Sequence, residues 1–151
     1  MILPEGITGF RGDRRDAPPP TVDPRSFARA CHAAARAESG EIERFEPARV
    51  SRNYHRAIFR LRDAAIAVLC NAHFPWIAFA EASDNLLLRF KEATPLAAWI
   101  EDAMPCEVVS LSSLEAPPDA GLLADLSPVE RQEIRYWRPQ RLGDIIFNFW
   151  D

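Results

Sequence analysis

The residues of this chain that could supply a nucleophile or a metal ligand are three cysteines and three histidines. Cys70 lies three residues before His73 in the sequence. Cys70 with either His73 or His55, oriented by Asp63 or Asp84, would make a Cys-His-Asp set for nucleophilic catalysis. Cys70 lies in an apolar run, however, where a thiol is expected to be buried and unreactive. A zinc site needs three or four ligands, and one Cys-x-x-His pair arises often by chance. We therefore expect neither catalysis at Cys70 nor a metal site.

Glycine-rich phosphate-binding loops are absent from the sequence, which contains neither G-x-G-x-x-G nor G-x-x-x-x-G-K-S/T. The nucleotide-binding enzyme classes that depend on such loops are therefore disfavoured, and we expect no cofactor. The sequence leaves enzymatic activity open and favours a protein without it.

Arginine recurs along one side of an alternating segment, residues 53–62. Residues two apart in a strand share a face. One face of this strand and its flanks would therefore carry a row of polar side chains: Arg52, Tyr54, Arg56, Arg60 and Arg62. Such a row predicts a surface for an anion or an acidic partner, because its charges reinforce one another. The alternative, which we favour, is that cross-strand pairs with Glu43, Glu81 and Glu92 neutralise the row.

Two other segments have compositions typical of protein-binding sites. Residues 135–139 read Arg-Tyr-Trp-Arg-Pro, and arginine, tyrosine and tryptophan are enriched at binding hot spots. The loop over residues 112–126 is acidic and would suit a basic partner. The partner-binding residues expected from these segments are Glu115, Asp119, Asp125, Trp137 and Arg138. The alternatives are that Trp137 anchors a helix to the core and that the loop is an ordinary surface loop.

Local signals place the elements that would hold these residues. Asp23 followed by Pro24 predicts the start of a helix that ends near Gly40. Thr94 followed by Pro95 predicts a second helix that ends at Pro105. A capping box at 127–130 predicts a third helix that runs to about residue 137. Apolar residues at helical spacing predict an amphipathic helix at the end of the chain, starting near 139 or 144.

Between these helices the sequence predicts five or six short strands, with a last one after the second helix: 42–50, 53–62, 65–70, 76–81, 86–92 and 106–111. Short connections imply an antiparallel meander. The predicted fold class is therefore α+β, with an N-terminal helix, an antiparallel meander sheet, and helices packed on it, two of them at the C-terminus. We expect residues 1–22 to form an extended arm rich in glycine and proline, and residues 23–151 to form a single domain.

Composition bounds the function classes. The chain has 151 residues, of which 48% are hydrophobic and 26% charged, as in an ordinary globular protein. Its net charge of −4 disfavours nonspecific nucleic-acid binding. The longest apolar-rich stretch, 64–82, is too polar to cross a membrane. The first residues lack the basic and apolar regions of a signal peptide, so we expect a cytoplasmic bacterial protein.

Three hypotheses about function follow. The first is a small acidic protein-binding module, for example an inhibitor of the bacterial toxin-immunity type. Its partner would be another protein, and the acidic charge of the chain would suit a basic one. The second is a small hydrolase or transferase of unrecognised family that would use His55, Cys70 or His73. The third is a self-assembling subunit, such as a homodimer, whose C-terminal helix would expose Phe147, Phe149 and Trp150. The absence of a catalytic motif favours the first hypothesis.

Overall fold

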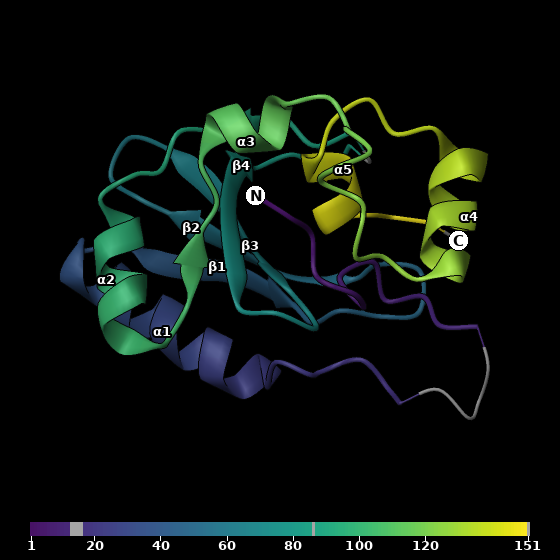
Figure 1. Ribbon diagram of the computed structural model, residues 1–151. Coiled ribbons are helices and arrows are strands. Elements are labelled where there is room, and N and C mark those ends of the chain that lie inside the picture. Colours follow the sequence, from purple (N-terminus) through teal and green to yellow (C-terminus); the bar gives the residue numbers. More distant parts are fainter. Residues whose placement is uncertain (13–16, 86, 151) are drawn as a thin grey trace.

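A six-stranded sheet with helices on both sides forms the body of the protein (Figure 1). The computed structural model describes residues 1–12, 17–85 and 87–150. The strands are β1 (Glu41–Glu46), β2 (Tyr54–Arg60), β3 (Ala65–Asn71), β4 (Trp76–Glu81), β5 (Phe90–Lys91) and β6 (Glu107–Val108). The helices are α1 (Pro24–Ala37), α2 (Leu96–Ala103), α3 (Leu111–Glu115), α4 (Pro128–Trp137) and α5 (Gly143–Ile146). This arrangement confirms the predicted α+β class, with its N-terminal helix and its C-terminal helices.

Strands β1 to β5 lie side by side in chain order, and each is antiparallel to its neighbours. Strand β6 departs from the predicted meander because it runs parallel to β4, with Trp76 opposite Glu107. Strand β5 pairs only with the last part of β4, at Phe79 and Ala80. The first part of that edge of β4 therefore has no partner from β5. Helix α2 brings the chain back to it, and β6 pairs there in the same direction as β4.

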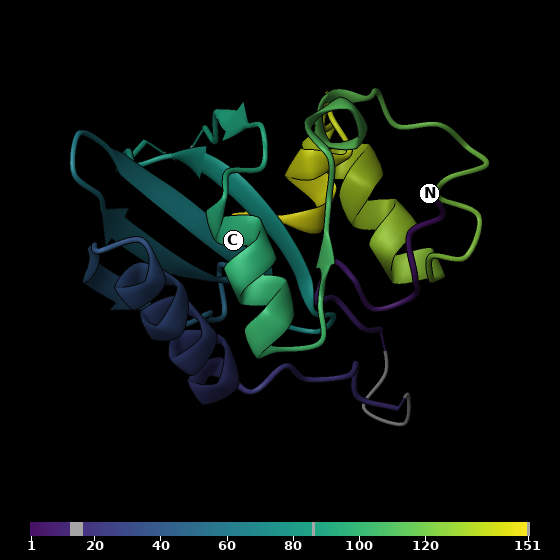
Figure 2. The same ribbon diagram turned by 90° about the vertical axis from the view of Figure 1, so that its left-hand side faces the viewer.

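The two faces of the sheet support separate cores. Ala57, Phe59 and Val68 point toward α1 and α2 and are fully buried. Tyr54, Ile58 and Leu69 lie in the other core, which the N-terminal residues and the C-terminal helices cover. Figure 2 shows α1 and α2 together on one side and α3, α4 and α5 gathered apart from them. The alternation predicted for residues 53–62 is therefore present, but both faces are covered.

Several elements are shorter than the sequence predicted. The first strand ends at Glu46, not at residue 50. The strand expected over 86–92 is reduced to β5, and Leu86 lies outside the described residues. The acidic segment predicted as a loop begins with a short helix, α3, where the Ser110 hydroxyl accepts a hydrogen bond from the Ser113 N–H (3.2 Å). Hydroxyl capping of this kind starts a helix even where the apolar pattern is weak.

The amphipathic helix predicted for the chain end is also wrong in length, because α5 ends at Ile146. Beyond it the backbone leaves the helix and pairs with the sheet. The N–H of Asn148 donates to Oδ1 of Asn53 (2.7 Å), and the N–H of Asn53 donates to the Asn148 carbonyl (3.3 Å). The prediction that these apolar residues are buried is confirmed, since Phe147 and Trp150 are almost fully covered.

The N-terminal residues lie in the core and are held by a buried carboxylate. Leu3 and Ile7 are fully buried. The Glu130 carboxylate accepts hydrogen bonds from the N–H groups of Gly6 (3.0 Å) and Thr8 (3.1 Å) and from the Thr8 hydroxyl (2.5 Å). Glu130 also completes the predicted capping box with Ser127. One residue therefore starts α4 and fastens the beginning of the chain to it.

Three buried asparagines fasten both ends of the chain to the sheet. The side-chain amides of Asn53 and Asn71 each donate to the carbonyls of Ile7 and Ile146, over 2.7–3.0 Å. Asn148 donates to the Thr8 carbonyl (3.1 Å). Buried side-chain amides need such hydrogen bonds, because a buried polar group without a partner lowers the stability of the fold. This network fixes the terminal segments against β2 and β3.

Among residues 1–12, 17–85 and 87–150, no helix is both long enough and apolar enough to span a bilayer.

Candidate functional site

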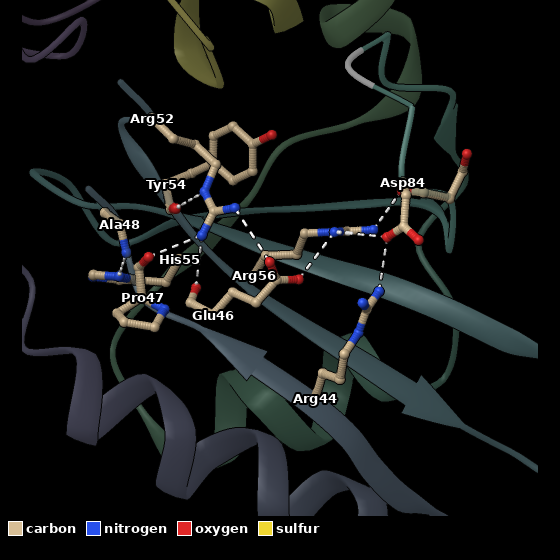
Figure 3. Close-up of polar contacts among 10 residues, drawn as sticks. Arg44, Glu46, Pro47, Ala48, Arg52, Tyr54, His55, Arg56 and Asp84 are labelled. Carbon is tan, nitrogen blue, oxygen red and sulfur yellow. Dashed lines mark hydrogen bonds and ion pairs between the residues drawn. The ribbon is translucent and has the colours of Figure 1, made fainter. Parts of the chain in front are cut away.

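The arginine row lies at the junction of β1, β2 and the turn after β4, and its inner members are buried (Figure 3). Arg52 donates through Nε to the Tyr54 carbonyl (3.2 Å) and through Nη2 to the carbonyls of Glu46 (3.2 Å) and Pro47 (2.8 Å). Its guanidinium also lies 5.2 Å from the centre of the Tyr54 ring. Burial lowers the pKa of Arg52, while the nearby tyrosine and Glu46 favour its charged form.

Two carboxylates are shared among three arginines at this junction. Nη1 of Arg56 lies 3.0 Å from Oε1 of Glu46, and Nη1 of Arg52 lies 3.5 Å from Oε2. Asp84 binds Arg44 (2.9 Å) and lies 3.8 Å from Arg56. The hydrogen bond from Arg44 lowers the pKa of Asp84. Figure 3 shows Arg44 and Arg56 pointing toward Asp84 from two strands, so this cluster ties the turn after β4 to β1 and β2.

The rest of the row is exposed, and one member is paired. Arg60 binds Glu43 (2.6 Å), one of the three partners predicted from the sequence. In the part of the chain that the structure describes, the other two, Glu81 and Glu92, make no ion pair. Arg62 is exposed beyond the end of β2. Tyr54, Arg56 and Arg60 alternate along β2, while the centre of the row is covered and its arginines are paired with Glu46 and Asp84.

The Cys-His-Asp set is not in a reactive state. Cys70 is fully buried, and burial raises the pKa of its thiol. His73 Nδ1 lies 2.9 Å from the Pro20 carbonyl, and His55 Nδ1 accepts from the Ala48 N–H (2.9 Å). Both imidazoles are thus engaged by the backbone. Within the described ranges, no group of three or more His, Cys, Asp or Glu side chains could hold a metal ion.

His55 makes the stability of the fold depend on pH. Because Nδ1 accepts the Ala48 N–H, protonation there breaks that bond, and burial lowers the pKa of His55 below its ordinary value of 6.5. Arg52 and His73 nearby also oppose its protonation, while the Val22 carbonyl and Asp23 favour it. The unfolded chain therefore binds a proton at a higher pH than the folded chain does. We expect the contribution of His55 to stability to be complete above about pH 7 and to decline as the pH falls through about 6.5.

Urea unfolding at a series of pH values between about 7.5 and 5 measures this decline. His55→Gln keeps an acceptor and a donor but does not titrate, so its stability should change less over the same range. An equal slope in both proteins would contradict a role for His55.

The C-terminal end of α4 carries an exposed aromatic group. Tyr136 is 76% exposed and Trp137 is 37% exposed. The two rings meet edge to face at a centroid distance of 5.3 Å. Trp137 donates its indole N–H to Glu133 (3.1 Å) and stacks on Trp150, with 2° between the ring planes. Trp137 is therefore supported on two sides, and Tyr136 packs against it while remaining mostly in solvent.

A cleft of about 280 Å³ separates the end of α4 from the C-terminal segment, and Trp137, Arg138, Phe149 and Trp150 are among the residues that line it. The guanidinium of Arg49, from the loop between β1 and β2, lies 5.3 Å from the centre of the Phe149 ring. We call Tyr136, Trp137, Arg138, Phe149 and Arg49 the α4 aromatic surface. The sequence pointed to Trp137 and Arg138 as partner-binding residues and, separately, to Phe149 as an assembly residue. It missed Arg49 and the approach of Arg49 to Phe149, because the two residues come from distant segments.

The acidic loop is partly engaged by the protein itself. Glu115 forms an ion pair with Arg141 (3.2 Å). Oδ1 of Asp119 accepts the Gly121 N–H (2.7 Å) and stabilises a turn. Asp125 is exposed and has no ion pair among the described residues. Of the three acidic residues expected to bind a partner, only Asp125 is left without a contact of this kind.

Comparison with protein-family models, with curated proteins and with solved structures finds no match to this chain.

Proposed function

We propose that this chain is a protein-binding module that captures another protein through the α4 aromatic surface. The observation that carries the proposal is the pair Tyr136 and Trp137: both are exposed, Tyr136 meets Trp137 edge to face, and Trp137 is supported by Glu133 and Trp150. Large rigid aromatic side chains supply contact area at a low cost in conformational entropy. Inhibition of the bound protein, as in toxin-immunity pairs, is one use of such a module.

The other hypotheses have less support. Self-assembly through the chain end would need exposed aromatic residues there, but Phe147 and Trp150 are buried within the chain and Phe149 is half-buried. Catalysis at Cys70 would need a thiolate, which its burial disfavours. The acidic loop remains a second candidate surface for a basic partner, although Glu115 and Asp119 already have contacts.

Tyr136→Ala tests the proposal. It removes the most exposed ring of the surface, so we expect capture of the partner to weaken about tenfold or more, the scale of a hot-spot residue. Stability should fall by less than about 1 kcal/mol, because the side chain is mostly in solvent. The measurement is affinity capture from the native host lysate, followed by binding titration with the captured protein after purification.

Trp99→Ala is the matched control. Trp99 is 44% exposed on α2, and its indole N–H is bound by a glutamate, Glu38 (2.8 Å), as that of Trp137 is by Glu133. Binding that Trp99→Ala preserves and Tyr136→Ala weakens supports the proposal. Binding unchanged in Tyr136→Ala refutes it, and loss only in the combined Glu115, Asp119 and Asp125 alanine variant assigns capture to the acidic loop. The absence of any partner favours the enzyme hypothesis.

A further inference from the structure

Arg138 has a backbone conformation that arginine rarely adopts. It caps the C-terminus of α4 with φ 50° and ψ 57°, in the left-handed region, and its N–H donates to the Ile134 carbonyl (2.9 Å). Glycine is the usual residue at such a position, because a Cβ there is sterically unfavourable. The chain therefore carries a strained residue where a glycine would end the helix more favourably. Backbone strain at an exposed residue supports the hypothesis that its side chain has a function.

The Arg138 side chain lies at the cleft of the α4 aromatic surface with its charge uncompensated. Among the described residues neither Arg138 nor Arg49 forms an ion pair. The guanidinium of Arg49 lies over the Phe149 ring, and Arg138 and Phe149 both line the cleft.

Two acidic groups near this surface have contacts within the chain. Asp144 is bound by Arg141 at 2.6 Å, and Glu133 accepts the Trp137 indole N–H. Within the described ranges, Arg138 and Arg49 are thus two guanidinium groups of this surface that no ion pair neutralises.

We propose that the α4 aromatic surface binds an acidic segment of its protein partner, with Arg138 and Arg49 donating hydrogen bonds to carboxylates that flank an apolar side chain. Guanidinium groups next to aromatic rings suit this combination, since the planar donors match a carboxylate and the rings accept the apolar part. Arg138 is then the residue that selects for acidic over basic partners. This inference rests on the proposed function, and it assigns the partner a charge opposite to the one that the acidic loop suggested.

Arg138→Gly separates the two roles of the residue. Glycine relieves the left-handed strain, so we expect the melting temperature to stay the same or rise, while binding of an acidic segment weakens about tenfold through loss of charge-assisted hydrogen bonds. Ser39→Gly is the matched control, because Ser39 follows α1 with φ 56° and is exposed. It relieves the same strain without touching the α4 aromatic surface and should leave binding unchanged. Arg49→Met, which keeps an apolar stem over Phe149, should weaken binding in the same direction as Arg138→Gly.

The probe is a capped nonapeptide of three Glu-Leu-Glu repeats, compared with its Lys-Leu-Lys counterpart. The readout is the indole N–H resonance of Trp137, assigned with Trp137→Phe. The inference is supported if the glutamate peptide shifts this resonance at millimolar concentration. The same shift should then need about tenfold more peptide in Arg138→Gly. Equal or stronger binding of the lysine peptide, unchanged binding in Arg138→Gly, or no shift with the glutamate peptide overturns the inference. If the peptide test fails but Tyr136→Ala still weakens capture of the cellular partner, only the acidic-segment inference is wrong and the proposed function stands. If Tyr136→Ala does not weaken capture either, both the inference and the proposed function are wrong.

Discussion

Replacing Glu130 by alanine should lower the free energy of unfolding by about 3–5 kcal/mol. The side chain is fully buried and accepts four hydrogen bonds, from Gly6, Ser127 and two groups of Thr8. Alanine leaves these donors without an acceptor, and each unpaired buried group costs about 1–3 kcal/mol. A loss of this size is a large part of the stability of a typical domain, about 5–15 kcal/mol. Urea unfolding followed by circular dichroism measures it.

Gln132→Ala is the control, since it changes an exposed residue of the same helix to the best helix former. Its stability should stay within about 0.5 kcal/mol of the starting protein. Because Glu130 holds the N-terminal residues, Glu130→Ala should also expose backbone amides of residues 6–8 to hydrogen exchange before the rest of the chain. If Glu130→Ala unfolds at the same urea concentration as Gln132→Ala, the buried carboxylate does not hold the N-terminal segment.

Asn71→Asp should cost about 3–4 kcal/mol, although the two side chains have almost the same shape. The Asn71 amide donates to the carbonyls of Ile7 (3.0 Å) and Ile146 (2.7 Å), and its oxygen accepts from the N–H groups of His73 and Phe74. Aspartate places a second oxygen opposite the two carbonyls, so two attractive contacts become repulsive in a fully buried site. Thermal and urea unfolding both measure the loss.

Asn85→Asp is the isosteric control in an exposed turn, and it should change stability by less than about 0.5 kcal/mol. Equal stability of Asn71→Asp and Asn85→Asp would contradict the importance of the asparagine network. The loss in Asn71→Asp should shrink at acidic pH, where the new carboxyl is protonated and can donate one hydrogen bond. An effect independent of pH would point to packing as its cause.

These two residues connect stability to the α4 aromatic surface. Glu130 lies in the first turn of α4, and the asparagines fix the segment that ends in Phe149 and Trp150. Trp150 in turn supports Trp137 by stacking. The surface is therefore built on the part of the fold where residues 6–8 and 146–148 are held, and this support reaches Trp137 through Trp150.

For the arginine row, the local pattern predicted which side chains share a face of the strand but not whether that face is exposed. Alternation correctly put Arg52, Tyr54 and Arg56 on one face of β2, because the side chains of a strand alternate in any fold. Whether that face meets water depends on what covers it, and here the N-terminal residues and C-terminal helices cover its centre. The partners of the row, Glu46 and Asp84, then follow from the register of β1 and from the turn after β4.

The sequence by itself determined the features that depend on neighbouring residues. The starts of α1 and α4 follow from Asp23 and from Ser127 with Glu130, and the strand faces follow from apolar alternation. Only the tertiary structure decided the early end of α5, the parallel pairing of β6, and the approach of Arg49 to Phe149, which lines one cleft with Arg138. The reason is that these features depend on contacts such as the one between Asn53 and Asn148, 95 residues apart, which no local pattern of propensity or periodicity records.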